Sequence, residues 1–133
     1  MKDTIMERVK ADPYANFLGI KIENIEEGKA VVSISVKENM LNFHGAANGG
    51  LIFSLADVAF AIASNSYGQT SVGINVSINY MKAAMLGDSL TATAEEVSKN
   101  PKLALYRLTV CNQHNEIIAV ADGMVYRKKE QFA

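Results

Sequence analysis

Hydrophobic and polar residues alternate along several stretches of this chain, which is the pattern of strands that bury one face. In the run AVVSISV at residues 30–36, for example, valine and isoleucine alternate with alanine or serine along most of the run. Strand-like runs of this kind, separated by turn-like residues, predict strands at residues 20–25, 30–36, 72–81, 90–97, 103–111 and 117–126. Because the separators between the last four runs are short, we expect antiparallel neighbours.

One long segment does not alternate. Between Gly49 and about Ser66 apolar residues fall on every side of a helix, which predicts a helix that is buried all round. A short amphipathic helix is predicted over residues 1–10 and ends at Asp12-Pro13, because the residue before a proline disfavours helical geometry. The order of strands, one helix and four strands favours an α+β fold in which a curved antiparallel sheet wraps around the helix. A sheet covers the helix on three sides only, so the fourth side points to a partner subunit.

Length and composition narrow the class of protein. The 133 residues predict a single domain over residues 1–133, since no linker or repeat interrupts them. Thirteen basic and fourteen acidic residues leave a net charge of -1, so no charge excess attracts nucleic acid or an anionic membrane. The single Cys111 has no partner for an internal disulfide and excludes a cysteine-based zinc site.

The location expected from the sequence is the cytoplasm. The first sixteen residues lack an apolar core of signal-peptide length. The most apolar run, residues 51–63, is too short to span a bilayer, which takes about 20 residues, and Ser54 and Asp57 interrupt it. We therefore expect no membrane insertion.

Asp57 is the only formally charged side chain between Glu38 and Lys82, and it lies in the middle of the apolar helix. Burial of an ionised carboxylate costs several kcal/mol, and no Lys or Arg is near in sequence to offset that cost. Two interpretations stand. Asp57 either caps a neighbouring loop through backbone N–H groups, or it is a functional carboxylate whose pKa is raised by an apolar wall.

The loop NFHGAANGG at residues 42–50 runs directly into the same helix. Adjacent glycines at a helix start permit close approach to free N–H groups at the positive end of the helix dipole, as an anion site or an oxyanion hole requires. The alternative is an ordinary N-cap by Asn48 followed by a tight turn. His44 is either a loop hydrogen-bonding residue or a base, and no Ser or Cys is evidently paired with it.

The spacing of these two features bears on how they work together. Gly49 and Asp57 are eight residues apart, or roughly 12 Å along a helix. One carbonyl group cannot contact both, because hydrogen bonds reach about 3 Å. The two residues either serve different purposes or come from different chains. Two antiparallel copies of the helix about a two-fold axis would bring Gly49 of one chain near Asp57 of the other.

These motifs resemble those of the hotdog-fold acyl-CoA thioesterases, and most closely the phenylacetic-acid-degradation (PaaI-type) branch. The resemblance rests on N-x-H-G-x-x-N-G-G at residues 42–50 and I-F-x-L-A-D-x-A-F-A at residues 52–61. It extends over about residues 15–127 and includes the strand at 75–82, which ends in a basic residue, and L-G-D at 86–88. The resemblance implies the hotdog fold, and dimers or dimers of dimers with sites at the subunit interface.

The resemblance also assigns catalytic roles. It implies that Asp57 is the catalytic carboxylate, acting as a general base on water or as a nucleophile on the thioester. Gly49 matches the backbone N–H that stabilises the oxyanion, and Asn42 matches the loop amide that orients the thioester or the water. The reaction implied is hydrolysis of a small acyl-CoA to free acid and CoA, with aryl or arylacetyl groups favoured over medium-chain fatty acyl groups.

Further residues are implied in substrate binding. Lys82 matches the basic residue near the coenzyme A phosphates, with Lys99 or Lys102 as helpers. The substrate-binding residues expected are His44, Asn48, Gly50, Lys82 and Lys102. Gly73 stands where some members carry a helper Ser or Thr. No metal and no cofactor is expected, because the coenzyme A thioester is itself the substrate.

Two other functions remain open on this fold. A non-catalytic acyl-CoA-binding module predicts an attached DNA-binding domain or a missing carboxylate, whereas this chain retains Asp57. A dehydratase or hydratase predicts a close Asp/His pair, for which His44 is the candidate partner. The order of glycine pair, helix and Asp fits hydrolysis better.

Overall fold

Six strands form one antiparallel sheet in the computed structural model, which describes residues 2–133. The strands are β1 (Lys21–Glu26), β2 (Lys29–Ser35), β3 (Gln69–Tyr80), β4 (Ser89–Lys99), β5 (Leu103–Cys111) and β6 (Ile117–Gln131). The helices are α1 (Lys2–Lys10), α2 (Pro13–Leu18), a short 3₁₀ helix η1 (Glu38–Met40) and α3 (Gly49–Ser64). No helix of the described residues is long and apolar enough to cross a membrane.

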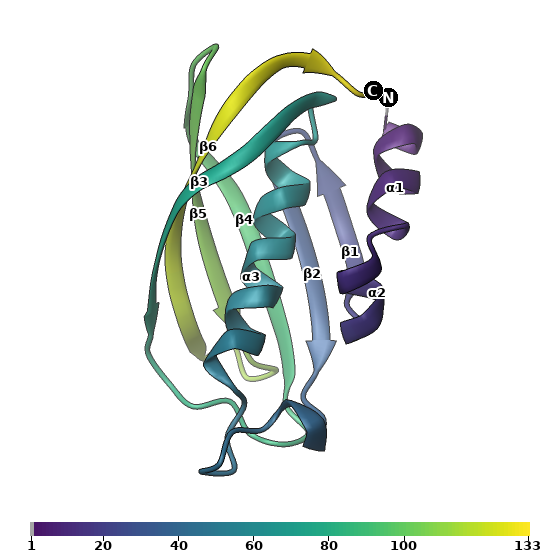
Figure 1. Ribbon diagram of the computed structural model, residues 1–133. Helices are drawn as coiled ribbons and strands as arrows, with labels where there is room; N and C mark the ends of the chain where they lie inside the picture. The colour runs from purple at the N-terminus through teal and green to yellow at the C-terminus, as the bar shows by residue number, and fades with distance from the viewer. Residues whose placement is uncertain (1) are drawn as a thin grey trace.

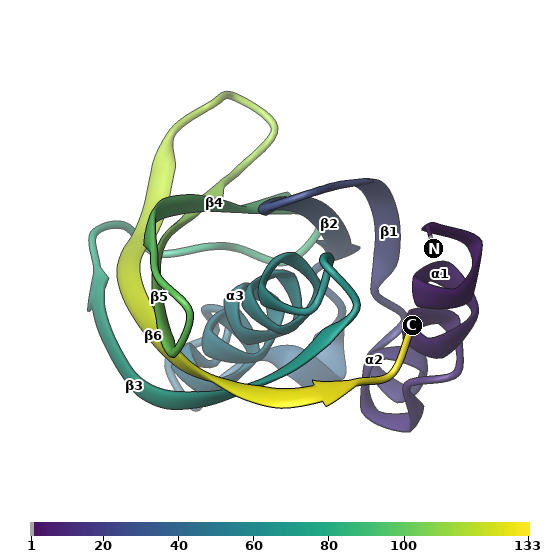
Figure 2. The same ribbon diagram turned by 90° about the horizontal axis from the view of Figure 1, so that it is seen from above.

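The sheet has the strand order β1-β2-β4-β5-β6-β3 and curves around α3, which fills its concave side (Figures 1 and 2). The helices α1 and α2 lie beyond the β1 edge, on one flank of α3. The predicted α+β fold, with a curved antiparallel sheet around one long helix, is confirmed. Strand β3 forms the other edge of the sheet and, among the described residues, pairs with β6 alone.

The prediction that β3 and β4 are neighbours is wrong. Strand β4 pairs with β2 and β5, while β3 pairs with β6. The reason is the connection at residues 81–88, which is longer than its three turn-like residues suggested. It is held against the loop before α3, because the backbone N–H of Ala47 donates to the C=O of Ala84 at 2.8 Å. The connection thereby passes under the start of α3 and leaves β3 at the sheet edge.

Helix α2 was not predicted from the sequence, although its signals are present. Asp12 ends α1 as expected, but its carboxylate also accepts hydrogen bonds from the N–H groups of Tyr14 and Ala15, which makes it the N-cap of a second helix. Pro13 occupies the first turn, and Gly19 closes the helix at a φ of 78°. An Asp-Pro pair can therefore end one helix and begin the next.

In the single chain, helix α3 is not buried all round, and one side is left open, as expected of a sheet that covers the helix on three sides only. Its exposed positions form one stripe with helical spacing, in which Gly50, Asp57 and Ala61 are exposed and Phe53 and Ser54 are half-buried. The hydroxyl of Tyr14 on α2 lies 2.8 Å from that of Ser54, so α2 is tied to this stripe. Because the sheet covers the other sides, the stripe is the open face of the helix.

The aromatic ring of Phe60 packs where β3 and β6 meet. It lies edge-on to Tyr106 at 5.9 Å between ring centroids. A Cβ atom at Gly123 would lie 2.8 Å from this ring, and one at Gly73 would lie 3.2 Å from it. The space for a side chain at Gly73 is thus restricted by Phe60.

Substitution of Gly123 by Ala is therefore expected to destabilise the protein. The added methyl group must displace the Phe60 ring, and such overpacking typically costs about 1–3 kcal/mol of unfolding free energy. Urea unfolding of the variant measures this loss. As a control, a second substitution, Phe60→Leu, should make the Gly123→Ala change less costly than it is in the parent. Equal costs in both backgrounds would contradict the packing explanation.

Candidate active site

A cavity of about 350 Å³ lies at the N-terminus of α3. It is walled by the loop before α3, the end of β3 and the connection that follows β3. Asn42, Gly49 and Lys82 all line it. The structure therefore brings three of the residues predicted from the sequence into one cavity.

The first turn of α3 offers a free N–H group in this cavity. The side-chain oxygen of Asn48 accepts a hydrogen bond from the N–H of Gly50 at 2.7 Å, and its C=O accepts from Leu51 and Ile52. The N–H of Gly49 donates no hydrogen bond to any residue that the structure describes. Gly49 thus keeps an unused donor at the positive end of the helix dipole, whereas the donor of Gly50 is used by the cap.

Tyr80 is part of this site and was not predicted from the sequence. Its hydroxyl donates a hydrogen bond to the C=O of Gly49 at 3.0 Å, and a Cβ atom at Gly49 would lie 3.4 Å from its ring. The side chain thereby fixes the first turn of α3. Alternation along β3, which puts Val76, Ile78 and Tyr80 on one face, could have indicated that Tyr80 points toward the helix.

Asn42 holds the loop in shape and retains a free donor. Its side-chain oxygen accepts hydrogen bonds from the N–H groups of His44 at 2.9 Å and Ala46 at 3.2 Å. Its NH₂ group donates to none of the described residues and so remains available to a ligand. His44 is exposed, packs its ring against Phe43 and does not line the cavity.

Lys82 already has an acidic partner in the single chain. Its ammonium group forms an ion pair with Glu116, which also accepts a hydrogen bond from Asn112. These contacts hold the pKa of Glu116 below its usual value, the Asn112 hydrogen bond first and Lys82 second. A phosphate group at Lys82 would therefore have to share or replace Glu116.

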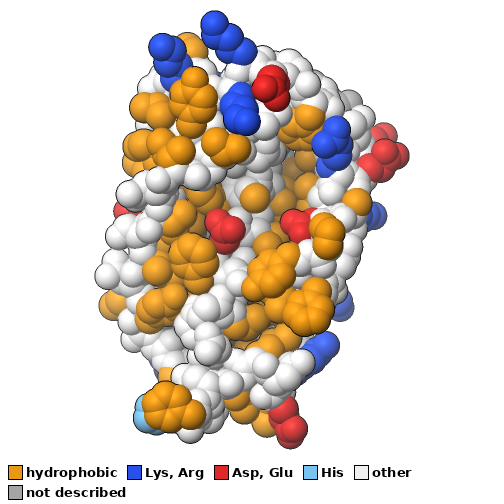
Figure 3. All heavy atoms as spheres, in the orientation of Figure 1, with side chains coloured by type: hydrophobic (Ala, Val, Ile, Leu, Met, Phe, Trp, Pro, Cys, Tyr) orange, Lys and Arg blue, Asp and Glu red, His pale blue; other side chains and the backbone are white. Residues whose placement is uncertain are grey.

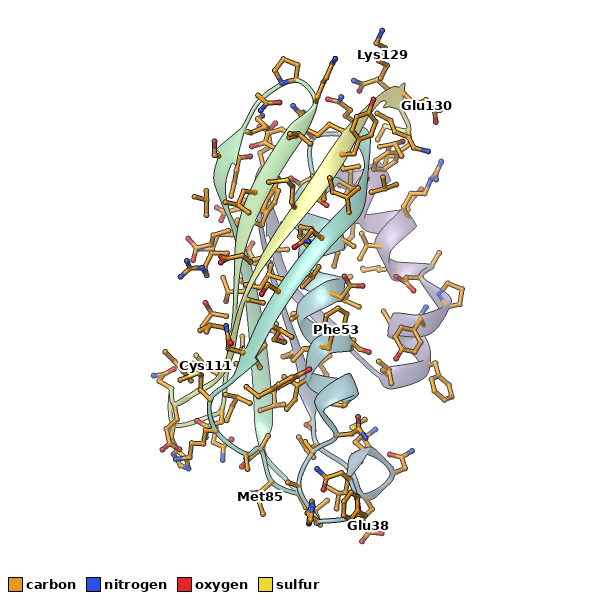
Figure 4. All side chains as sticks on the ribbon, turned by 60° about the vertical axis from the view of Figure 1, so that its left-hand side comes forward. Glu38, Phe53, Met85, Cys111, Lys129 and Glu130 are labelled. Atoms are coloured by element: carbon orange, nitrogen blue, oxygen red, sulfur yellow. The ribbon has the colours of Figure 1, made fainter. Side chains whose placement is uncertain are left out.

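Lys102 lies at the opposite end of the sheet. Its C=O accepts a hydrogen bond from the N–H of Arg127, which pairs with Ser71 at the start of β3, whereas Lys82 follows the end of β3. The length of the strand between these points is about 35 Å. Figure 4 shows the two ends, marked by Met85 and Lys129. Lys82 and Lys102 of one chain do not meet at one site.

Asp57 lies on the exposed stripe of α3, outside the cavity at Gly49. Its carboxylate accepts no hydrogen bond within residues 2–133, so it does not cap a neighbouring loop. The surrounding protein removes part of its hydration and raises its pKa, and the charge of Asp12 raises that pKa further. This direction agrees with the expectation of a carboxylate made more basic by its surroundings.

The face that carries this stripe is hollowed. Figure 3 shows acidic side chains in the middle of the face, with hydrophobic side chains on both sides of them. Figure 4 places Phe53 on the same side of α3, away from the curved sheet. Within the part of the chain that the structure describes, no group of three or more His, Cys, Asp or Glu side chains is placed to hold a metal ion.

Comparison with known proteins then places the chain in a family. The family model described as the thioesterase superfamily matches residues 44–119, which include α3, most of the loop at residues 42–50 and every residue that lines the cavity except Asn42. The chain belongs to the thioesterase superfamily. This thioesterase is 46% identical to a putative esterase of Archaeoglobus fulgidus, over 98% of this chain and 88% of that protein. It is 39% identical to the acyl-coenzyme A thioesterase PaaI of Escherichia coli, over 87% of this chain and 83% of that protein.

Known structures resemble this thioesterase over almost its whole length. The structure of E. coli PaaI superimposes with a TM-score of 0.93 and 33% identity, and 99% of each chain is covered. A hypothetical thioesterase from Streptococcus pneumoniae, crystallised with coenzyme A, superimposes with a TM-score of 0.88 and 29% identity, over 96% of this chain and 99% of that one. These matches confirm the hotdog fold, the PaaI-type branch and the enzyme class, a thioester hydrolase.

Proposed function

We propose that this thioesterase hydrolyses acyl-CoA thioesters with small acyl groups, aryl or arylacetyl, to free acid and CoA. The observation that carries the proposal is the free N–H of Gly49, which lies in a cavity with the Asn42 amide and Lys82. An acyl-CoA thioesterase among the relatives and a structural neighbour crystallised with coenzyme A support the choice of substrate.

The chemistry follows from these groups. The N–H of Gly49 donates to the thioester oxygen and stabilises the negative charge that develops there. Asp57 takes a proton from water as the water oxygen bonds to the carbonyl carbon, or it attacks that carbon itself and forms an acyl anhydride, which water then hydrolyses to the free acid and the Asp57 carboxylate. When the C–S bond breaks, the CoA thiolate leaves with the electron pair and receives a proton. The raised pKa of Asp57 strengthens it as the base.

We further propose that Gly49 and Asp57 of one site come from two chains. They are eight residues apart on one helix, or about 12 Å, which is too far for both to act on one carbonyl group. Two antiparallel α3 helices about a two-fold axis would place Gly49 beside Asp57 of the partner subunit. Support comes from β3, a long edge strand with exposed apolar side chains at Val72 and Ile74.

Incubation with a panel of acyl-CoA thioesters and a thiol reagent tests the proposed reaction. We expect release of the CoA thiol together with the free acid. Binding without thiol release would favour the non-catalytic module instead. Loss of the enoyl-CoA absorbance without thiol release would favour a hydratase, which the position of His44 outside the cavity makes the weaker candidate.

The pH dependence of hydrolysis should change when Asp12 is replaced by Asn. Asn is as good an N-cap as Asp, so α2 should remain, but the negative charge near Asp57 is lost. Since the carboxylate must be ionised to act, activity falls as pH decreases through the pKa of Asp57. That pKa decreases in Asp12→Asn, so the acidic limb of kcat/KM should move to lower pH. A limb that stays in place or moves upward would contradict the predicted coupling.

A further inference from the structure

A second cavity, of about 270 Å³, lies between α1, α3 and the end of the chain. It is separate from the cavity at Gly49, with which it shares no lining residue. Its apolar wall comes from three segments that are far apart in sequence. Helix α1 contributes Ile5 and Val9, α3 contributes Val58, Ala61 and Ile62, and the end of the chain contributes Phe132. The N-terminal helix is therefore a structural part of this cavity.

Asp57 does not line this cavity, but its neighbour Val58 on α3 does. Ala61 lies one turn after Asp57 on the exposed stripe of α3, about 6 Å further along the helix axis. Asp12, whose charge acts on the Asp57 carboxylate, also lines the cavity. A group held at Asp57 can thus extend along the stripe and enter the cavity past Ala61.

An aromatic ring and a cation also line the cavity. Phe132 lines it, and the guanidinium group of Arg8 lies over the Phe132 ring at 5.4 Å from the centroid. The backbone N–H of Phe132 donates to the C=O of Gly68 at 2.8 Å, which fixes the end of the chain there. The volume equals that of about nine water molecules, so a phenyl ring with a short linker or a medium-length chain has room.

We propose that this second cavity receives the acyl group of the substrate, so that α1 and Phe132 determine acyl specificity. The inference rests on the proposed acyl-CoA thioesterase function. In the proposed site formed by two subunits, the chain that supplies Asp57 holds the acyl group. The cavity at Gly49 of the other subunit receives the coenzyme A part of the substrate. The mainly apolar lining selects an uncharged aryl or alkyl group, and the Phe132 ring sets the largest length.

The test measures binding of S-alkyl-CoA thioethers of increasing chain length, because these ligands lack the carbonyl group that is cleaved. In the parent, the affinity should rise about fourfold for each methylene group that enters the cavity, and then stop rising. Ala61→Phe, which fills the entrance, should remove the increase for all but the shortest chains. Phe132→Ala, which removes the end wall, should move the plateau to longer chains.

Phe17→Ala serves as the matched control, because Phe17 is 82% exposed on α2 and does not line the cavity. It should leave the length profile of the parent unchanged. An unchanged profile in both Ala61→Phe and Phe132→Ala, or a parent with no length dependence, would overturn the assignment. The two cavity variants act in opposite directions, so misfolding of one cannot mimic the expected pair of results.

The outcome is separable from that of the proposed function. If the thioethers follow the expected profile but no acyl-CoA releases thiol, hydrolysis is wrong and the acyl cavity stands. If acyl-CoA is hydrolysed but the profile is absent, only the assignment of the cavity fails.

Discussion

Replacement of Asp57 by Asn is expected to lower kcat by about 10²–10⁴-fold, the usual contribution of a general acid or base. The amide has the shape of the carboxylate but can neither accept the proton from water nor attack the thioester. Gly49 and Asn42, which bind the carbonyl group in the proposed site, are unchanged. KM should therefore change much less than kcat, and steady-state kinetics with one acyl-CoA measures both.

The same variant should be as stable as the parent, or more stable, at neutral pH. The pKa of Asp57 is raised above its ordinary value of 3.8 on folding, so the folded chain binds this proton more tightly than the unfolded chain. At a pH above the raised pKa, the ionised carboxylate disfavours the folded state, and Asn removes that effect. The stability difference should disappear below pH 3.8, where both states of the parent are protonated. Thermal unfolding at several pH values measures this.

Together the two measurements separate chemistry from folding. A variant that is inactive because it is unfolded would lose stability, whereas a variant that has lost its base keeps or gains it. Hydrolysis of acyl-CoA by Asp57→Asn at the parental rate would show that the proposed mechanism is wrong.

Local patterns predicted most elements of the fold. The alternating runs became strands and the apolar segment became α3, because both patterns record which face of an element is buried. The position of β3 could not be predicted from the length of a turn, since it depends on the contact between Ala84 and the loop before α3. The open stripe of α3 also depends on the tertiary structure, because an apolar helix does not show which of its sides the sheet leaves uncovered.

Some residues of the candidate site could also be predicted from local sequence, whereas others depend on the tertiary structure. Gly49, Asn42 and Asp57 were predicted because they lie in one short motif of unusual composition. Tyr80 and Asp12 act on these residues from distant segments. Alternation along β3 indicates at most which face Tyr80 lies on, and neither residue's own surroundings show which part of α3 it acts on. The sequence also could not show that Lys102 and Lys82 lie at opposite ends of the sheet, since that depends on the course of β3.

Replacement of Gly49 by Pro should remove the oxyanion donor without disturbing the helix. Proline is favoured in the first turn, where no N–H is needed for the helix, and Gly49 donates none to the described residues. Asn48 already has φ -61° and ψ 135°, the conformation that a following proline requires. Loss of one such donor should lower kcat by about 10²–10³-fold. Gly49→Ala is the control, because it adds the same Cβ atom near Tyr80 but keeps the N–H.

Because Gly49→Pro and Asp57→Asn damage opposite parts of the proposed site, mixing the two chains tests whether one site is built from two subunits. If it is, a mixed dimer has one site with Gly49 and Asp57 both intact and one site with both replaced. Random assortment then makes half of the dimers mixed, and about a quarter of all sites should be active. Two nearly inactive proteins should therefore regain about a quarter of the parental rate after joint refolding. If each site belonged to a single chain, every site would carry one of the two substitutions, and the mixture would stay as inactive as its components.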